Sequence, residues 1–357
     1  MSNLVPNLQR VLKRLDRALS GPIVEFSEQF LYGHREILVD YAKLEANSMI
    51  KGSIEHGWAL DSGRGIRKLS GGRYLYLSWS SARVSRSGVS ENTTVAIGAP
   101  FIYAFDKVDE QIKEFLKKYP VDPSRILFFP VHGNEFSQQN PESQIALFKE
   151  KYDPRNATVS LYWVEYINPV IYSLYKQEGF TIVCSGFSGQ MEHTGLGYSA
   201  RRLAASPIGG RPSFILNTIA MLATYSKVVF GGLGTGVFYA GYMRKDIEML
   251  HKYLTTTFLD MDSERGTSFE AHPQEARYVK YVADYMECNF DEIDYNTDEF
   301  YKLADLELGK ADMRSSDQLR EILQNFLSNS ANIQPLGVYQ ENLSNFNLLL
   351  KNYSSLQ

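Results

Sequence analysis

The sequence predicts an α/β fold that contains a parallel β-sheet. In the second half of the chain, short apolar segments with strand character alternate with segments that have helical spacing. This alternation is typical of βαβ units, whose strands run parallel. A glycine-rich turn follows the last apolar segment, and open parallel sheets bind ligands at such strand ends. Hydrophobic residues form 44% and charged residues 22% of the 357 residues, so the chain has enough apolar material for two cores.

The elements of the second half follow one another closely. We expect strands at 126–129, 158–162, 181–184 and 227–230, and helices at 142–151, 169–178, 213–224 and after Gly236. Strands joined in this way by helices form parallel sheets flanked by helices.

The first half has a weaker pattern of the same kind. Helical spacing occurs at 8–19 and 33–44, strand-like segments lie at 53–55, 74–78 and 94–97, and a charged helix precedes the turn at Pro120–Pro123. We therefore expect an N-terminal domain (1–105), a linker (106–124), a C-terminal domain (125–327) and a polar helical tail (328–357).

Charge and hydropathy limit the class of protein. The net charge of −4 excludes a nucleic-acid binder that relies on an overall positive field. We expect a cytoplasmic protein, because the sequence lacks a signal peptide pattern and any run of about 18 apolar residues. The basic amphipathic segment 8–19 leaves two roles open, which are peripheral contact with the inner membrane and coverage of the core.

The two cysteines are far apart and form no metal-binding or disulfide pattern. Cys184 ends an apolar strand-like run, which predicts a buried free thiol.

The glycine loop at residues 231–236 is the strongest local signal. The apolar strand 227–230 leads into Gly231-Gly232-Leu233-Gly234-Thr235-Gly236, and a helix is expected to follow. Glycine lets the backbone come close to a ligand. The free N–H groups of a helix start attract an anion, and the Thr235 hydroxyl can add a hydrogen bond. The sequence is neither a P-loop nor a dinucleotide fingerprint. We expect the loop to bind phosphate, and the alternative is a packing turn without a ligand.

Two histidines follow predicted strands. His56 stands beside Glu55 after a strand of the first half, and His132-Gly133 follows the first strand of the second half. An imidazole near a carboxylate suits general acid–base chemistry or hydrogen bonding to a diphosphate or ribose. The competing interpretation of each is a structural histidine.

Charged side chains elsewhere add weaker candidates. Arg211 and the Arg201-Arg202 pair are candidate cations for phosphate. Asp260-Met261-Asp262 has the spacing of a divalent-metal site, but such short acidic patterns are common by chance, and we expect no metal.

Several short segments together resemble a family of bacterial surface-carbohydrate biosynthesis proteins of the GT-B glycosyltransferase-like type. They occur in the family's order over residues 33–242, about two-thirds of the chain. The matching segments are Gly33-His34-Arg35-Glu36, Ile54-Glu55-His56-Gly57-Trp58, 97–103, 127–132, 159–163, 179–183 and 234–240.

The resemblance implies two Rossmann-like domains that face each other across a cleft. The N-terminal domain would bind the acceptor glycan, with His56, Glu55 or Asp61 as the candidate catalytic base. The C-terminal domain would bind the nucleotide sugar. Its expected ligands are His132, Gly133, Gly232, Gly234, Thr235, Gly236, Tyr239 and Arg211.

The expected activity is a metal-independent glycosyltransferase without a cofactor. It would move a sugar from a nucleotide donor to a growing capsule or lipopolysaccharide glycan, lipid-linked acceptors included. Two alternatives stay open, a nucleotide-sugar epimerase on the same fold and a non-catalytic carbohydrate-binding or assembly protein. The residues after His132 depart from the family pattern with Gly133-Asn134-Glu135, so the donor nucleotide and sugar stay open as well.

Overall fold

The computed structural model describes residues 32–46, 48–50, 52–55, 57–58, 60, 75–87, 94–131, 137–186, 214–250, 256–258, 267–269, 273–289, 292–324, 327–329 and 337–356.

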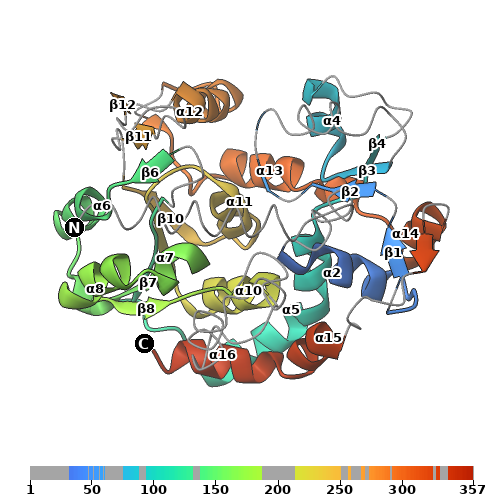
Figure 1. The fold of residues 1–357 in the computed structure, drawn as a ribbon, viewed down its shortest axis with the longest axis horizontal. Helices are drawn as coiled ribbons and strands as arrows, with labels where there is room; N and C mark the ends of the chain where they lie inside the picture. The colour runs from blue at the N-terminus through green and yellow to red at the C-terminus, as the bar shows by residue number, and fades with distance from the viewer. Residues whose placement is uncertain are drawn as a thin grey trace.

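A five-stranded parallel sheet forms the centre of the second half (Figure 1). Its strands are β5 (Ile126–Phe129), β7 (Ala157–Ser160), β8 (Thr181–Val183), β9 (Lys227–Phe230) and β10 (Asp246–Met249). All neighbouring pairs are parallel. The spatial order is β8-β7-β5-β9-β10. If the strands are numbered by their order along the chain, they lie across the sheet in the Rossmann-like order 3-2-1-4-5. The direction of this order changes between β5 and β9.

Helices join these strands. They are α6 (Pro141–Lys149), α7 (Trp163–Ile167), α8 (Pro169–Gln177), α10 (Phe214–Thr224) and α11 (Thr235–Tyr242). The predicted α/β fold with a parallel sheet flanked by helices is therefore confirmed. The edge strand β10 was not predicted, because Asp246 and Glu248 interrupt its apolar character.

A second, smaller parallel sheet lies in the first half. It has the order β2-β3-β4, with β2 (Gly52–Ile54), β3 (Leu75–Ser78) and β4 (Thr94–Ala96). Helix α4 (Ser81–Ser87) follows β3, and α5 (Pro100–Lys118) follows β4. The chain thus repeats βαβ construction on a smaller scale.

The charged stretch predicted as a linker is largely a core helix. Helix α5 extends to Lys118 and buries Val108, Ile112 and Phe115 on one face, at the three- to four-residue spacing of an amphipathic helix. It packs against α2 (His34–Tyr41) and α10. Its lysines and glutamates form the opposite, solvent-facing side.

The segment after residue 297 packs back on the first half. Strand β13 (Leu327–Asn329) pairs antiparallel with β1 (Ser48–Ile50), and the backbone N–H of Ala99 donates to the carbonyl of Leu308 at 2.8 Å. The predicted domain boundary at residue 327 falls inside this segment. The other elements of the described part are β6 (Ser137–Gln139), β11 (Thr256–Phe258), β12 (Thr267–Phe269), α12 (Pro273–Tyr285), α13 (Asp298–Glu307), α14 (Ser316–Gln324), α15 (Gly337–Ser344) and α16 (Phe346–Ser354).

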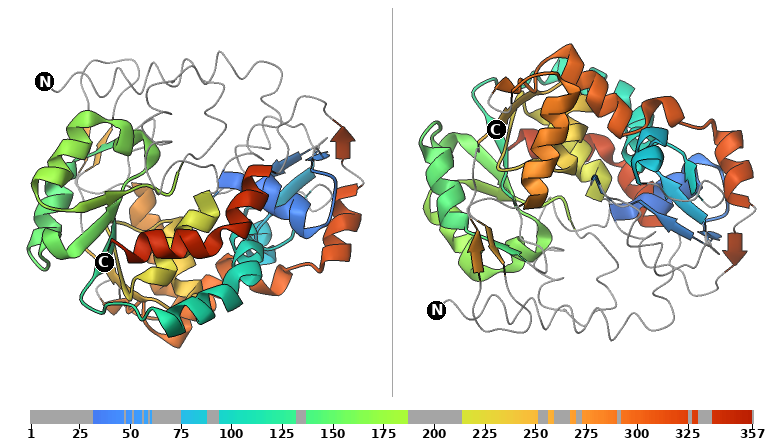
Figure 2. Two further views of the ribbon diagram at one scale, coloured as in Figure 1. Left: turned by 90° about the horizontal axis from the view of Figure 1, so that it is seen from below. Right: turned by 90° about the horizontal axis from the view of Figure 1, so that it is seen from above.

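The tail predicted at residues 328–357 ends in a packed helix. Phe346, Leu350 and Tyr353 of α16 are fully buried, and α16 lies against α10 and α5 (Figure 2). The tail was predicted as helical and polar, and its many Asn and Ser residues conceal the apolar face that packs against α10 and α5.

One continuous apolar core links the two halves. It joins Leu77 and Phe101 of the first half to Ile215 and Phe238 of the second, while a smaller cluster fills the other face of the five-stranded sheet. The prediction of a buried free thiol is confirmed for Cys184, and burial raises the pKa of this thiol to about 12.

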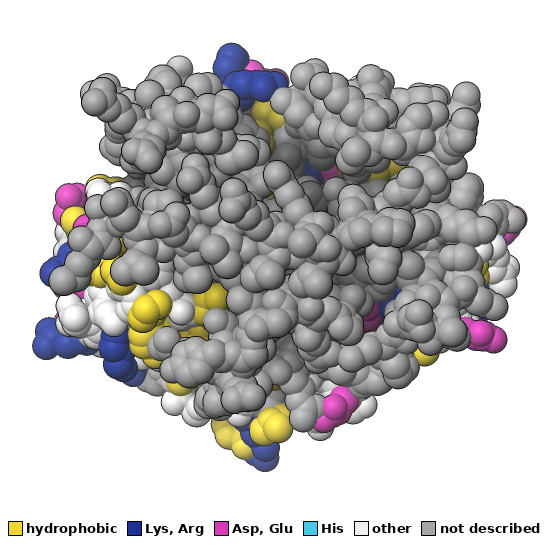
Figure 3. All heavy atoms as spheres, viewed as in Figure 1, with side chains coloured by type: hydrophobic (Ala, Val, Ile, Leu, Met, Phe, Trp, Pro, Cys, Tyr) yellow, Lys and Arg dark blue, Asp and Glu magenta, His cyan; other side chains and the backbone are white. Residues whose placement is uncertain are grey.

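Most of the charged side chains that Figure 3 shows, of both signs, lie near the outline of the molecule in that view. Exposed ion pairs such as Lys149–Glu178, at 2.6 Å, each contribute at most about 1 kcal/mol.

Within the described segments, no helix is both long and apolar enough to cross a bilayer. The predicted helix at 8–19 lies outside the described residues.

Lys245, directly before β10, provides a test of buried charge. Desolvation lowers the pKa of its ammonium group to about 8, and its Nζ has the carbonyl of Ala223 as a hydrogen-bond acceptor at 3.3 Å. The unfolded chain holds this proton up to a pKa of about 10.4, so the folded state is penalised at neutral pH. This penalty disappears as the pH rises from 8 to 10.5.

We expect Lys245→Met to be more stable than the wild type by about 2 kcal/mol at pH 7. Urea unfolding of both proteins at pH 7 and pH 10.5 measures the difference, which should vanish at the higher pH. The matched control is Lys117→Met at an exposed position of α5, where the substitution should change stability by less than about 0.5 kcal/mol. Equal stability at pH 7 would contradict the buried charge.

Candidate functional site

The glycine loop lies where the strand order of the large sheet changes direction. The backbone N–H of Gly231, directly after β9, donates to the carbonyl of Phe129 at the end of β5 over 2.8 Å. The loop therefore occupies the carboxyl edge of the sheet between β5 and β9. In open α/β sheets, this crevice is where ligands bind.

The glycines of this loop have different steric surroundings. A Cβ atom on Gly231 would lie 2.8 Å from the backbone nitrogen of Val131, and one on Gly236 would lie 3.0 Å from the Phe230 ring. Gly234 has an extended φ of −157°, and no described heavy atom lies within 4 Å of a Cβ placed there. Packing therefore explains Gly231 and Gly236, whereas Gly234 leaves open space at the helix start.

Gln144 fixes the neighbouring end of β5, which sequence reasoning missed. Its side chain accepts from the N–H of Val131 at 2.6 Å and donates to the carbonyl of Val131 at 2.9 Å. Asn140 caps α6 by accepting from the N–H of Glu142 at 3.0 Å. The sequence Asn-Pro-Glu at the start of this helix could have predicted the contact. It marks the beginning of α6 and so places Gln144 in the first turn, beside the end of β5.

Thr235 brings the two halves into contact. Its hydroxyl oxygen accepts from the backbone N–H of Trp58 at 2.8 Å. A Cβ on Gly57 would lie 3.3 Å from the same oxygen. Gly57 and Trp58, which follow the end of β2, therefore touch the start of α11. Helix α11 lies near the centre of the molecule in Figure 1. The sequence singled out both segments, and the structure places them together.

Glu55 is an internal ion-pair partner. It is 2% exposed and accepts from the Ser78 hydroxyl at 3.0 Å and from the Trp79 N–H at 2.8 Å. The Arg83 guanidinium donates to its other oxygen through Nε and Nη2. Burial alone would lower the pKa of Arg83. The adjacent Glu55 carboxylate has the larger, opposite effect, so the pKa of Arg83 is raised. Both carboxylate oxygens of Glu55 are therefore engaged inside the protein, and its role as a catalytic base stays a prediction.

A second buried carboxylate, Glu307 of α13, collects donors from three other segments. Its Oε2 accepts from the indole N–H of Trp58 at 2.6 Å and from Arg86 at 2.7 Å, and its Oε1 accepts from the Tyr281 hydroxyl at 2.6 Å. Arg83 Nη1 lies 3.5 Å from Oε2. Sequence reasoning missed this network, since its members are scattered along the chain and form no local pattern.

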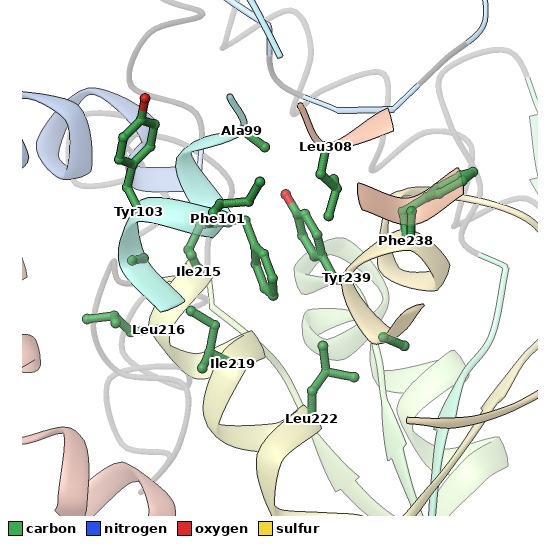
Figure 4. Packing of buried hydrophobic residues seen from close by; sticks show 14 of the residues in the cluster. Ala99, Phe101, Tyr103, Ile215, Leu216, Ile219, Leu222, Phe238, Tyr239 and Leu308 are labelled. Carbon is green, nitrogen blue, oxygen red and sulfur yellow. The ribbon is translucent and has the colours of Figure 1, made fainter. Parts of the chain in front are cut away.

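Tyr239 is a core residue. Its ring is 3% exposed and stacks on Phe101 with 3.9 Å between centroids and 6° between planes (Figure 4). Burial raises the pKa of its hydroxyl far above the ordinary value. Its second-turn position on α11 points Tyr239 into the shared core, and its predicted contact with the donor stays a prediction.

The remaining predicted site residues divide into two groups. Gly232, Gly234, Thr235 and Gly236 are partly exposed on the loop and helix start. His56, Asp61, His132, Gly133, Arg211, Asp260 and Asp262 lie outside the described residues. Among the residues that are described, no group of three His, Cys, Asp or Glu side chains has the arrangement of a metal site.

Comparison with known proteins gives no match to any family model and no significant match to a curated protein.

Proposed function

We propose that the protein is a glycosyltransferase whose Gly231–Gly236 loop binds the phosphates of a nucleotide-activated sugar. The observation that carries the proposal is the open space at Gly234 beside the partly exposed start of α11. The helix N-terminus has free N–H groups and a partial positive charge, which favour a phosphate there. The Thr235 hydroxyl adds a hydrogen-bonding group at the same place.

The proposal extends to the arrangement of the two halves. The large sheet would belong to a donor domain and the small sheet to an acceptor domain, with the sugar transferred in a cleft between them. An acceptor hydroxyl attacks the anomeric carbon while the bond from that carbon to the phosphate oxygen breaks. The nucleotide leaves with the bonding electrons, and a base takes the hydroxyl proton. His56 is the candidate base. A capsule or lipopolysaccharide glycan is the proposed acceptor, in the cytoplasm.

Incubation with a panel of nucleotide sugars tests the reaction. The purified protein is mixed with UDP-, GDP-, ADP-, CDP- and CMP-sugars, with and without acceptor glycans, and each reaction is repeated in EDTA. Nucleotide release that requires the acceptor supports transfer. Conversion of the sugar without an acceptor would establish an epimerase instead, and binding without turnover a carbohydrate-binding protein. Loss of activity in EDTA would overturn the metal-independent mechanism.

Gly234→Val should separate ligand binding from folding. The added side chain enters the open space at the loop, so we expect at least a 10-fold loss of nucleotide affinity, or about 1.4 kcal/mol. The melting temperature should change by no more than about 2 °C, because the backbone of Gly234 suits any residue. Calorimetric titration and thermal unfolding measure the two effects.

Gly231→Ala is the contrasting variant. Its methyl group meets the Val131 backbone, so it should lower stability by about 1–3 kcal/mol. A folded Gly234→Val protein with unchanged nucleotide affinity would exclude the phosphate site.

A further inference from the structure

Trp58 connects the start of α11 to the buried charges behind it. The residue is 5% exposed. Its backbone N–H donates to Thr235 and its indole N–H to Glu307. Its ring packs on Phe238 and Tyr278, with centroid distances of 4.4 and 4.8 Å. Trp58 therefore contacts α11, α12 and α13 simultaneously.

The contact with Trp58 determines what the Thr235 hydroxyl can do. A threonine hydroxyl has one hydrogen to donate and can accept at its oxygen. Since the oxygen accepts from the Trp58 N–H, the hydroxyl hydrogen points elsewhere. Thr235 is partly exposed at the first position of α11, so its hydroxyl can donate this hydrogen to an acceptor oxygen of a ligand at the helix start.

The indole is held by charge as well as by packing. Glu307, its acceptor, is fully buried and is also bound by Arg86. Arg83 lies between Glu307 and Glu55 and contacts both carboxylates. Charge-assisted hydrogen bonds of this kind are short and directional. The backbone at residue 58 is therefore fixed from two sides, by the ion-pair network and by the rings of Phe238 and Tyr278.

We infer that Trp58 is a positioning residue for the donor phosphate. Its backbone N–H holds the Thr235 hydroxyl as a hydrogen-bond donor to a phosphate oxygen, and its indole N–H on Glu307 keeps that backbone in place. The inference rests on the proposed function, because the proposed function identifies the ligand of the glycine loop as a phosphate. The small sheet then contributes to phosphate binding through Trp58, which does not itself contact the phosphate.

A double-mutant cycle between Trp58→Phe and Thr235→Val tests the coupling. The probes are inorganic pyrophosphate and the nucleotide that binds most tightly in the panel above. Trp58→Phe keeps an aromatic ring on Phe238 but loses the bond to Glu307, and we expect affinity to fall about 5-fold. Thr235→Val should lower it about 10-fold, and Thr235→Ser should restore it. The double variant should bind no more weakly than Thr235→Val alone.

A second measurement does not depend on a ligand. Hydrogen exchange of the Trp58 amide should be slow in the wild type and in Thr235→Ser and fast in Thr235→Val. The matched control is Tyr225→Phe, which loses a buried hydrogen bond of 2.7 Å to Thr158 near the opposite edge of the sheet. It should lower stability without changing the affinity for either probe.

The outcomes distinguish the two proposals. Binding of either probe with additive losses in the double variant would overturn the role of Trp58 and leave the phosphate site standing. Unchanged exchange of the Trp58 amide in Thr235→Val would overturn it as well. If neither probe binds the wild type, the proposed function fails, and the inference fails with it.

Discussion

Replacing Gly309 by alanine is expected to destabilise the protein by about 4 kcal/mol. Gly309 has a φ of +70° in the left-handed region, where a side chain costs about 1–2 kcal/mol. A Cβ there would lie 1.8 Å from the carbonyl oxygen of Trp79. That oxygen accepts from the N–H of Gly98 at 2.9 Å, so it cannot move without breaking the hydrogen bond that joins the chain after β3 to the chain after β4.

Denaturant unfolding of Gly309→Ala measures this loss. Gly234→Ala is the appropriate control, because the open space at that glycine predicts a change below about 1 kcal/mol. A loss of under about 1 kcal/mol for Gly309→Ala would mean that the segment after α13 moves readily away from the small sheet.

Removal of the Arg83 charge is the second large effect. Arg83→Met keeps most of the side-chain volume but leaves the buried Glu55 carboxylate without its guanidinium partner. Removing one member of a buried ion pair lowers stability by about 3–5 kcal/mol. We expect a loss of this size at pH 7, because Arg83 is 1% and Glu55 2% exposed at the side chain.

The double variant Arg83→Met/Glu55→Gln identifies the cause. Glu55→Gln removes the buried carboxylate charge that Arg83→Met leaves without a partner. At least half of the lost stability should therefore return. Urea unfolding of the two single variants and the double variant completes the cycle. If the double variant is as unstable as the sum of the single variants, the destabilisation comes from lost packing.

The sequence pattern predicted the large sheet well and its surroundings poorly. Apolar runs such as Ile126–Phe129 and Lys227–Phe230 are local signals, and the helices between them require parallel strands. The association of the halves depends on partners far apart in the chain. Nothing near Phe101 indicates that its ring stacks on Tyr239, and the charged residues of α5 conceal its buried face.

The candidate site shows the same division. The glycine loop was predictable, since its spacing after an apolar strand is a short-range feature, and the structure places it at the strand-order switch. The environment of Glu55 was not predictable. A carboxylate at a strand end suggests chemistry, and only the position of Arg83, 28 residues later, shows that it is an internal counter-ion. Glu307 is 249 residues from Trp58, beyond any local pattern.

The return of α16 to the core has a consequence for biosynthesis. Phe346, Leu350 and Tyr353 fill space between α10 and α5, and β1 obtains its partner strand from residues 327–329. On the ribosome, the faces of α10 and α5 that α16 covers therefore stay uncovered until residue 353 has left the exit tunnel. A nascent chain stalled before α16 would expose these apolar faces, which are the kind of surface that chaperones bind.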